Sequence, residues 1–300
     1  MTFSHPGLLY GSESDFLDVV VPFVRTAVAA GNPVLVAVPA GNRGLLAAAL
    51  GDDRVAFSDM SDLGLNPGRI IPSVLLPFAD AHPGRRVSIV GEPVWPGRTP
   101  AECDACATHE ALVNKAFAGR DASILCPYDT SRLDPSTLDD AWRTHPSMIE
   151  KGTELPSPSY GEPVERPLPP PPANAPALSY ALVADLRQLR DFVRAQATGV
   201  LPAQRVRELV LAAHELAANT VRHAGGPGLI RVWRSPGALE CQVDDRGHIA
   251  DPLAGRVPPP PVQQTGRGLL LVHQLCDLVR VRSGPAGTSI RLTMAVAAAR

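Results

Sequence analysis

Lysine is almost absent from this chain of 300 residues, although lysine and arginine together number 28. The only lysines are Lys115 and Lys151, and neither follows a glycine-rich turn between a strand and a helix. A Walker A phosphate loop requires a lysine at that place. The sequence therefore excludes a nucleotide site of the Walker type.

The chain also lacks an excess of charge of either sign. Its net charge of -2 and its pI near 6.4 provide no positive field of the kind that nucleic acid attracts, so we expect no direct nucleic-acid partner. No apolar run is long enough to cross a bilayer, and the first residues do not resemble a secretory signal. We therefore expect a cytoplasmic protein without membrane contact.

Cysteine is sparse and odd in number. The five cysteines are scattered along the chain, which argues against a secreted disulfide framework and favours reduced thiols. Cys103, Cys106 and His109 recur every three residues, so one helical face could carry all three as metal ligands. That segment supplies no second cysteine or histidine pair to complete tetrahedral coordination, and an ordinary helix is the alternative.

A proline-rich stretch divides the chain. Residues 151–176 contain the run Pro169 to Pro172 and few apolar side chains, a composition typical of an extended linker. We therefore expect one domain at residues 1–150 and a second at residues 177–300.

The first part alternates short apolar runs with helical patterns. We expect strands at 34–38, 54–57, 87–90 and 123–126 and helices at 12–30, 67–81, 100–118 and 135–142. This alternation predicts an α/β/α domain, in which helices cover both faces of a mostly parallel sheet.

The second part has a different order of elements. Helical patterns at 178–196 and 202–223 come first, and strands at 229–234, 239–243, 279–282 and 289–294 follow, with a helix at 269–276 between the strand pairs. The strands alternate apolar and polar residues, as in a sheet with one packed face. The pattern predicts an α/β sandwich with helices on one side of a mixed sheet.

Two motifs of the second part contain polar side chains suited to metal or base chemistry. Glu215 and Asn219 lie four residues apart, on one helical face, where an amide can help to hold Mg²⁺ and a carboxylate can act as a base. Asp245, followed by Arg246 and Gly247, ends a strand and can accept a hydrogen bond from an adenine amino group. A solvated helix face and a plain turn are the alternatives.

Two further motifs contain glycine. Gly266-Arg267-Gly268 precedes an expected helix, where backbone N–H groups and the helix N-terminus favour phosphate. Gly287-Thr288 joins the last two strands and is compatible with a simple hairpin.

In this fixed order the motifs resemble those of the GHKL ATPases, and most specifically the anti-sigma regulatory factor branch, which includes serine/threonine kinases. The resemblance covers residues 178–294 and implies a Bergerat fold that binds Mg-ATP beneath a lid at 248–265. It makes Glu215 the base, Asn219 the Mg²⁺ ligand and Asp245 the adenine ligand. The other implied nucleotide contacts are Gly247, Gly266, Gly268, Leu269 and Thr288, with Arg222 or Arg267 as candidates on the phosphates.

Two departures from the relatives limit what this resemblance implies. His248-Ile249 stands where histidine kinases usually have a second glycine, so the phosphate side of the site differs. No phosphoacceptor histidine helix precedes the module, so we do not expect self-phosphorylation on histidine.

The first part resembles the MEDS sensory domain, a distant relative of RecA-like folds found in regulators linked to small organic compounds. The matching segments are 5–10, 91–97, 109–114 and 126–129. The loop at 39–44 lacks the lysine of RecA-like ATPases, so nucleotide hydrolysis is not expected there. The pocket candidates for a small-molecule signal, placed near strand ends or on the helix between the last two strands, are Glu92, Trp95, His109, Glu110 and Tyr128.

Three hypotheses follow. The first is a signal-responsive serine/threonine kinase of the anti-sigma type, acting on a sigma factor or an anti-sigma-factor antagonist, with a homodimer as a candidate assembly. The second is an ATP-binding module that sequesters such a partner without phosphoryl transfer. The third is a small-molecule sensor whose second domain has lost ATP binding.

Overall fold

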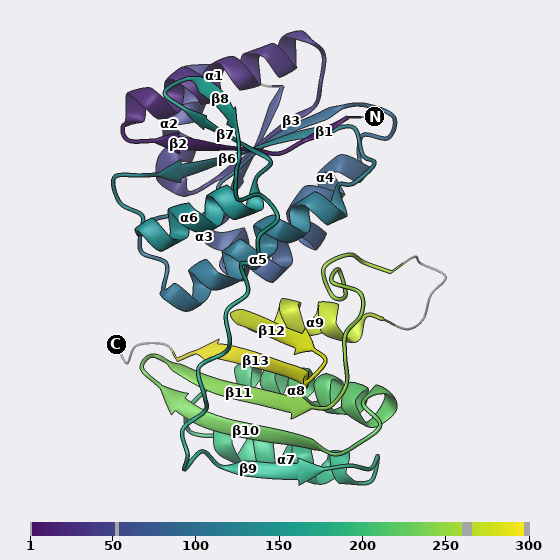
Figure 1. The fold of residues 1–300 in the computed structure, drawn as a ribbon. Coiled ribbons are helices and arrows are strands. Elements are labelled where there is room, and N and C mark those ends of the chain that lie inside the picture. Colours follow the sequence, from purple (N-terminus) through teal and green to yellow (C-terminus); the bar gives the residue numbers. More distant parts are fainter. Residues whose placement is uncertain (1, 52–53, 260–265, 297–300) are drawn as a thin grey trace. The chain divides into compact units, whose positions relative to one another are not determined.

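The computed structural model describes residues 2–51, 54–259 and 266–296, and it divides the chain into two compact units (Figure 1). The first unit is Met1–Glu165 and the second is Arg166–Arg300. Each has its own sheet and its own apolar core. Within the described ranges, no helix combines the length and the apolar character that crossing a membrane demands.

The first unit is built on an eight-stranded sheet with the order β4-β3-β5-β6-β2-β7-β8 and with β1 beside β6. The strands are β1 (Phe3–Ser4), β2 (Pro6–Tyr10), β3 (Val34–Val38), β4 (Val55–Asp59), β5 (Val87–Gly91), β6 (Ala122–Asp129), β7 (Ser147–Glu150) and β8 (Thr153–Pro156). Neighbouring strands run parallel, except for the antiparallel pair β7 and β8. Every residue of β3 is buried, as in a strand covered on both faces. The predicted mostly parallel sheet is confirmed.

Helices cover both faces of this sheet, with α1 and α2 on one side and α4, α5 and α6 on the other (Figure 1). The helices are α1 (Glu13–Ala29), α2 (Ala40–Leu50), α3 (Met60–Leu63), α4 (Leu76–Asp80), α5 (Pro100–Ala116) and α6 (Pro135–Thr144). The start of α5 is fixed by a capping box, because the Thr99 hydroxyl accepts from the Glu102 amide while the Glu102 carboxylate accepts from the Thr99 amide.

The expectation of one helix at 67–81 is wrong. The segment begins with a 3₁₀ turn (η1, Pro67–Arg69), continues as a π-helical turn (η2, Ile71–Leu75) and becomes α-helical only in α4. Pro72 and Pro77 have no amide hydrogen and therefore interrupt a regular hydrogen-bond ladder. Helix α2 and the strands β2 and β7 were not predicted from the sequence.

The second unit is a five-stranded antiparallel sheet with the order β12-β13-β11-β10-β9. Its strands are β9 (Ala177–Tyr180), β10 (Gly228–Ser235), β11 (Ala238–Asp245), β12 (Leu278–Gly284) and β13 (Gly287–Ala295). Its helices, which pack on one face of the sheet (Figure 1), are α7 (Asp185–Ala197), α8 (Ala203–His223) and α9 (Gly268–Leu275). The α/β sandwich is confirmed, whereas the expected mixed sheet is wrong because every pairing is antiparallel.

The expected helix at 178–196 begins too early. Leu178 and Tyr180 alternate with more exposed neighbours and belong to β9. The helix starts only at Asp185, whose carboxylate accepts from the amides of Ala181 and Leu182. Alternation, and not helical periodicity, decides the structure of the strand residues at the start of this segment.

The stretch at 151–176 is not an extended linker throughout. Its first part contains β8, which pairs with β7 and belongs to the first unit. In its last part, the carbonyls of Arg166 and Pro169 accept hydrogen bonds from Arg282 and Arg291 of the second unit's sheet. The prolines therefore run along folded surfaces.

Candidate functional site

The second unit contains a pocket of about 730 Å³ between α8, the start of α9, the end of β11 and the start of β13. This volume lies within the range of roughly 300–1,000 Å³ that is usual for small-molecule sites. The lining includes every residue that the sequence analysis assigned to the nucleotide, namely Glu215, Asn219, Asp245, Gly247, Gly266, Gly268, Leu269 and Thr288. Motifs more than 70 residues apart in sequence thus meet at one place.

Helix α8 presents the first motif to this pocket. Its buried face belongs to the apolar core through residues such as Ala213 and Ala217, which leaves Glu215 and Asn219 half-buried on the pocket side. Gly268, the first residue of α9, lies directly opposite: a Cβ atom there would be 3.0 Å from Glu215 Oε2 and 3.5 Å from Asn219 Nδ2. A side chain at position 268 would therefore occupy the space in front of both groups.

Asp245 is held in place by hydrogen bonds on both carboxylate oxygens. The Thr220 hydroxyl donates to Oδ2 at 2.6 Å, and the Gly247 amide donates to Oδ1 at 2.8 Å. Thr220 in turn accepts from the buried Tyr180 hydroxyl at 3.1 Å. Each carboxylate oxygen retains acceptor capacity for a further donor in the pocket.

Thr288 is positioned to shape the pocket wall. Its hydroxyl donates to the Gly247 carbonyl at 2.9 Å, which joins β13 to the turn after β11. Gly287 before it has φ +129, and a Cβ atom there would lie 2.3 Å from the Asp245 carbonyl oxygen. Only glycine fits this close approach of two backbones.

Two arginines and part of the expected lid also line the pocket. Arg222 and Arg267 are both exposed at its edge. Residues 248–259 form turns and irregular backbone, with Gly255 against Leu269, whereas residues 260–265 of the expected lid lie outside the described residues. Arg256 in this segment is buried, and burial lowers its pKa to about 10.

In the first unit, Glu92 belongs to a polar network at the carboxyl ends of the parallel strands. Its carboxylate accepts from the Tyr10 hydroxyl at 3.1 Å and from the Asn42 amide at 2.8 Å. Asp129 at the end of β6 accepts from Arg132 close by. Burial of Glu92 raises the pKa of its carboxyl to about 7.

The other pocket candidates of the first unit have different contacts. Trp95 stacks on the Arg98 guanidinium at 3.5 Å, and Tyr128 is fully buried. His109 and Glu110 lie on α5 and line a small enclosed cavity of about 10 Å³. The five candidates thus lie in different surroundings in the structure.

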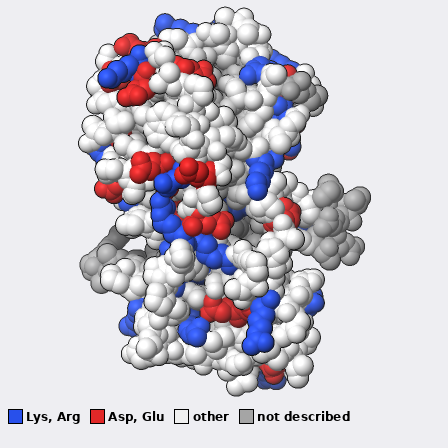
Figure 2. Space-filling view, in the orientation of Figure 1, with Lys and Arg blue, Asp and Glu red and all other residues white. Residues whose placement is uncertain are grey.

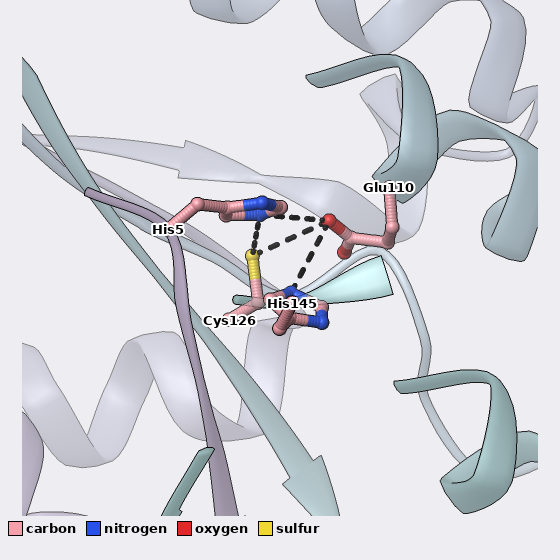
Figure 3. Close-up of side chains that lie close together, drawn as sticks. All are labelled: His5, Glu110, Cys126 and His145. Carbon is pink, nitrogen blue, oxygen red and sulfur yellow. Dashed lines mark hydrogen bonds and ion pairs between the residues drawn. The ribbon is translucent and has the colours of Figure 1, made fainter. Parts of the chain in front are cut away.

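Glu110 instead takes part in a buried cluster with His5, Cys126 and His145 (Figure 3). Burial lowers the pKa of the His145 ring to about 3 and, together with the nearby Glu110 carboxylate, raises the pKa of the Cys126 thiol. Burial opposes ionisation of Glu110, but the hydrogen bond to His5 and the surrounding imidazoles lower its pKa overall. Of the expected metal ligands Cys103, Cys106 and His109, none belongs to this cluster.

Comparison with known families identifies both parts of the chain. The model described as "MEthanogen/methylotroph, DcmR Sensory domain" (MEDS) matches residues 4–146, and that described as "Histidine kinase-like ATPase domain" matches residues 180–294. The chain contains a MEDS domain and a histidine kinase-like ATPase domain. No curated protein sequence matches the chain.

Two solved structures show weaker similarity. The RsbU and RsbW domains of Rv1364c from Mycobacterium tuberculosis are 18% identical over 40% of this chain and 32% of that chain, with a TM-score of 0.30. The Acinetobacter baumannii histidine kinase AdeS is 10% identical over 42% of this chain and 70% of that chain, with a TM-score of 0.26.

Several residues of these two domains escaped the sequence analysis. In the ATPase domain, Thr220 and Tyr180 orient Asp245. Thr220 directly follows Asn219 and lies on the buried face of α8, and this position in the helix could have indicated its role. In the MEDS domain, His5 and His145 each precede a proline next to a strand, and only the strand pairing of β2 with β6 and β7 brings them together.

Proposed function

We propose that the ATPase domain binds Mg-ATP in its pocket and transfers the γ-phosphoryl group to a serine or threonine of a partner regulatory protein. The coarser assignment is that of an ATP-binding signalling regulator. The finer proposal names the partner class, a sigma factor or an anti-sigma-factor antagonist, and makes the MEDS domain the part that responds to a small-molecule signal. The observation that carries it is the convergence of all eight expected nucleotide residues on one pocket.

The residues present fit a nucleotide. Asp245 offers a fixed acceptor at the end of β11, as recognition of an adenine amino group requires. Gly268 leaves open the space before Glu215 and Asn219 and begins a helix whose N-terminal N–H groups favour phosphate. The volume suits a ligand of this size.

Within this site, the side chains have distinct roles. Asn219 would hold Mg²⁺ through its amide oxygen, and Glu215 would accept the proton of the partner's hydroxyl. Bound ATP supplies the phosphoryl group. Thr288 shapes the site through Gly247, because its hydroxyl already donates to that carbonyl. Positioning and charge neutralisation are the main demands of phosphoryl transfer, and these groups meet them.

The distribution of charge on the surface also supports a protein partner. On the face shown in Figure 2, lysine and arginine side chains are interspersed with aspartate and glutamate. This mixture matches the net charge of -2 and differs from the basic stripe that nucleic-acid binding needs.

Nucleotide binding is tested first, by thermal unfolding of the full chain with Mg-ADP. A ligand at a hundredfold excess over its Kd stabilises the native state by roughly 2.7 kcal/mol. We expect the wild type to shift and Asp245→Asn and Asn219→Ala to lose the shift. Asp244→Asn is the matched control, since the neighbouring Asp244 pairs with Arg231 and is not part of the pocket lining. Absence of a wild-type shift would remove the nucleotide site.

Phosphoryl transfer is tested with Glu215→Gln. We expect this variant to bind Mg-ADP like the wild type but to transfer no labelled γ-phosphate to serine or threonine in proteins of a cell extract. Equal labelling by both forms would remove the role of Glu215 as base.

A non-catalytic sequestering module is the second candidate. It is favoured by His248-Ile249 at the place of the second glycine in the relatives. In that case the wild type shifts with Mg-ADP yet transfers no phosphate.

A further inference from the structure

The buried cluster of the MEDS domain is assembled from four separate segments (Figure 3). His5 lies between β1 and β2, Glu110 lies on α5, Cys126 lies in β6 and His145 follows α6. All four side chains are at most 3% exposed. Four side chains of metal-binding types in one buried place need compensating partners, because buried polar groups without them are costly.

His145 shows that such a partner is required. Its Nδ1 lies 2.9 Å from the Ala141 carbonyl, which can only accept, so Nδ1 carries the hydrogen and Nε2 of the neutral ring has a lone pair. That Nε2 faces the Glu110 Oε2 atom at 3.7 Å, and it is buried without a hydrogen-bond donor among the described residues. Two acceptors thus face each other, an arrangement that a cation between them would stabilise.

The ring of His5 is oriented in the same way. Asn114 donates its amide to the carbonyls of Thr144 and Glu110, so its oxygen faces His5 Nδ1 at 3.1 Å and accepts from it. The other ring nitrogen, Nε2, points at Glu110 Oε2 and at Cys126 Sγ, at 3.2 and 3.3 Å. A histidine that donates one N–H to an oxygen and offers the other nitrogen has the orientation usual for metal ligands.

The distances match a tetrahedral site. Zinc bonds of about 2.0–2.3 Å to nitrogen, oxygen and sulfur place neighbouring ligand atoms about 3.3–3.7 Å apart. Four of the six separations between the ligand atoms are 3.2, 3.3, 3.5 and 3.7 Å, and all four atoms lie within 4.8 Å of one another. A carboxylate and a thiolate would also balance the double charge of Zn²⁺, which leaves the buried site neutral.

We propose that the MEDS domain binds one Zn²⁺ ion through His5 Nε2, Glu110 Oε2, Cys126 Sγ and His145 Nε2. On binding, the Cys126 thiol releases its proton to solvent and the sulfur bonds to the metal. All four coordination positions come from the protein, and the cavity beside Glu110 and Cys126 holds about one water molecule. The site is therefore structural: it ties the first strands and the last strands of the domain to α5. The proposal does not depend on the nucleotide chemistry of the ATPase domain.

The test uses the full chain, stripped of metal with a chelator and titrated with Co²⁺, which occupies zinc sites and gives a charge-transfer absorption when a thiolate binds it. We expect one equivalent of Co²⁺ with this absorption, displaced by Zn²⁺. Cys126→Ser should lose the absorption and weaken Co²⁺ binding by about a hundredfold or more. Cys103→Ser, on α5 but outside the cluster, should behave like the wild type.

Two results overturn the proposal: no thiolate absorption in the wild type together with no zinc in the purified protein, or an absorption that persists in Cys126→Ser. Circular dichroism verifies that the variant is folded. If it is not, His145→Asn replaces it, with the same expected loss of binding, and the wild-type titration alone still decides whether a thiolate-bound metal exists.

Discussion

The two polar sites of this chain differ in how they meet solvent. In the ATPase domain, Glu215, Asn219 and Asp245 are half-buried around an open pocket of about 730 Å³. In the MEDS domain, the cluster around Glu110 is almost fully buried, and the adjoining cavity measures about 10 Å³. An open pocket can exchange a large ligand, whereas a closed cluster can hold only an ion or a water molecule.

The two sites also differ in what fixes their geometry. The ATPase pocket depends on the space left by Gly268, on the close backbone approach at Gly287 and on the hydrogen bonds of Asp245. The MEDS cluster depends on side chains that fill the space between a sheet and a helix. Substitutions should therefore act through backbone fit in one domain and through buried charge in the other.

The largest effect is expected from Gly287→Ala in the ATPase domain. The added Cβ atom would meet the Asp245 carbonyl oxygen at 2.3 Å, in a conformation with φ +129 that alanine rarely adopts. We expect a loss on the order of 3 kcal/mol in the free energy of unfolding, since neither backbone can move without breaking the pairing of β11 with β13. Urea unfolding followed by Trp233 fluorescence, with the other tryptophans replaced by phenylalanine, measures it.

Gly284→Ala is the control for this substitution. Gly284 lies opposite Gly287 in the same hairpin, has open space at its Cβ position and does not have a positive φ. A similar loss from both variants would show that the hairpin tolerates no side chain at all and that the close approach to Asp245 is not the cause.

The next effect is the dependence of the unfolding free energy on pH that Glu92 contributes. The pKa of this carboxyl is about 7 in the folded protein, above its ordinary value of 4.5. Its contribution to stability is therefore complete below about pH 4.5 and is lost as the pH rises through about 7, by roughly 3 kcal/mol. Glu92→Gln keeps an acceptor for Asn42 but cannot ionise, so the difference in unfolding free energy between the two proteins should change over this window.

The measurement is urea unfolding between pH 4 and 8 in a Trp233→Phe background, where the remaining tryptophans, Trp95 and Trp142, report on the MEDS domain. Parallel pH profiles for the wild type and Glu92→Gln would mean that the carboxyl ionises normally and is not desolvated by its burial.

Most of the ATPase domain could be predicted from the sequence, because local sequence patterns determine its site. The spacing of Glu215 and Asn219 places both on one face of α8. Gly268 leaves room in front of these two side chains, and Gly287 allows a close approach to the backbone of Asp245. β9 was missed because its four residues are too short to outweigh the helical pattern that follows. Thr220 was missed because its role depends on the carboxylate of Asp245, 25 residues away.

The MEDS cluster could not be predicted in this way. Its members are separated by up to 140 residues in sequence, and only the pairing of β2 with β6 and β7 places His5 beside Cys126 and His145. The helical spacing of Cys103, Cys106 and His109 was a local pattern, and the packing of α5 instead turned Glu110 toward the cluster. Contacts across a parallel sheet carry no local sequence signal.

A smaller effect is expected from Thr220→Val, which keeps the shape of the side chain but removes the hydroxyl that donates to Asp245 Oδ2 at 2.6 Å. A hydrogen bond to a charged group contributes roughly 1.5 kcal/mol or more, so we expect the Kd for Mg-ADP to rise about tenfold. Isothermal titration calorimetry measures it. Thr220→Ser restores the hydroxyl and should restore most of the affinity; equal weakening in both variants would show that packing, not the hydrogen bond, holds Asp245.

The smallest effect is expected from Tyr180→Phe, one step further from the pocket. Tyr180 donates to Thr220 at 3.1 Å but does not contact Asp245 through a hydrogen bond of its own. Without this donor, Thr220 still donates to Asp245, so the Kd for Mg-ADP should change by less than about threefold, while the free energy of unfolding falls by about 1 kcal/mol. If Tyr180→Phe weakened binding as much as Thr220→Val, the orientation of Asp245 would depend on the whole chain of hydroxyls. The ATPase site would then resemble the MEDS cluster, where a buried network and not the backbone sets the geometry.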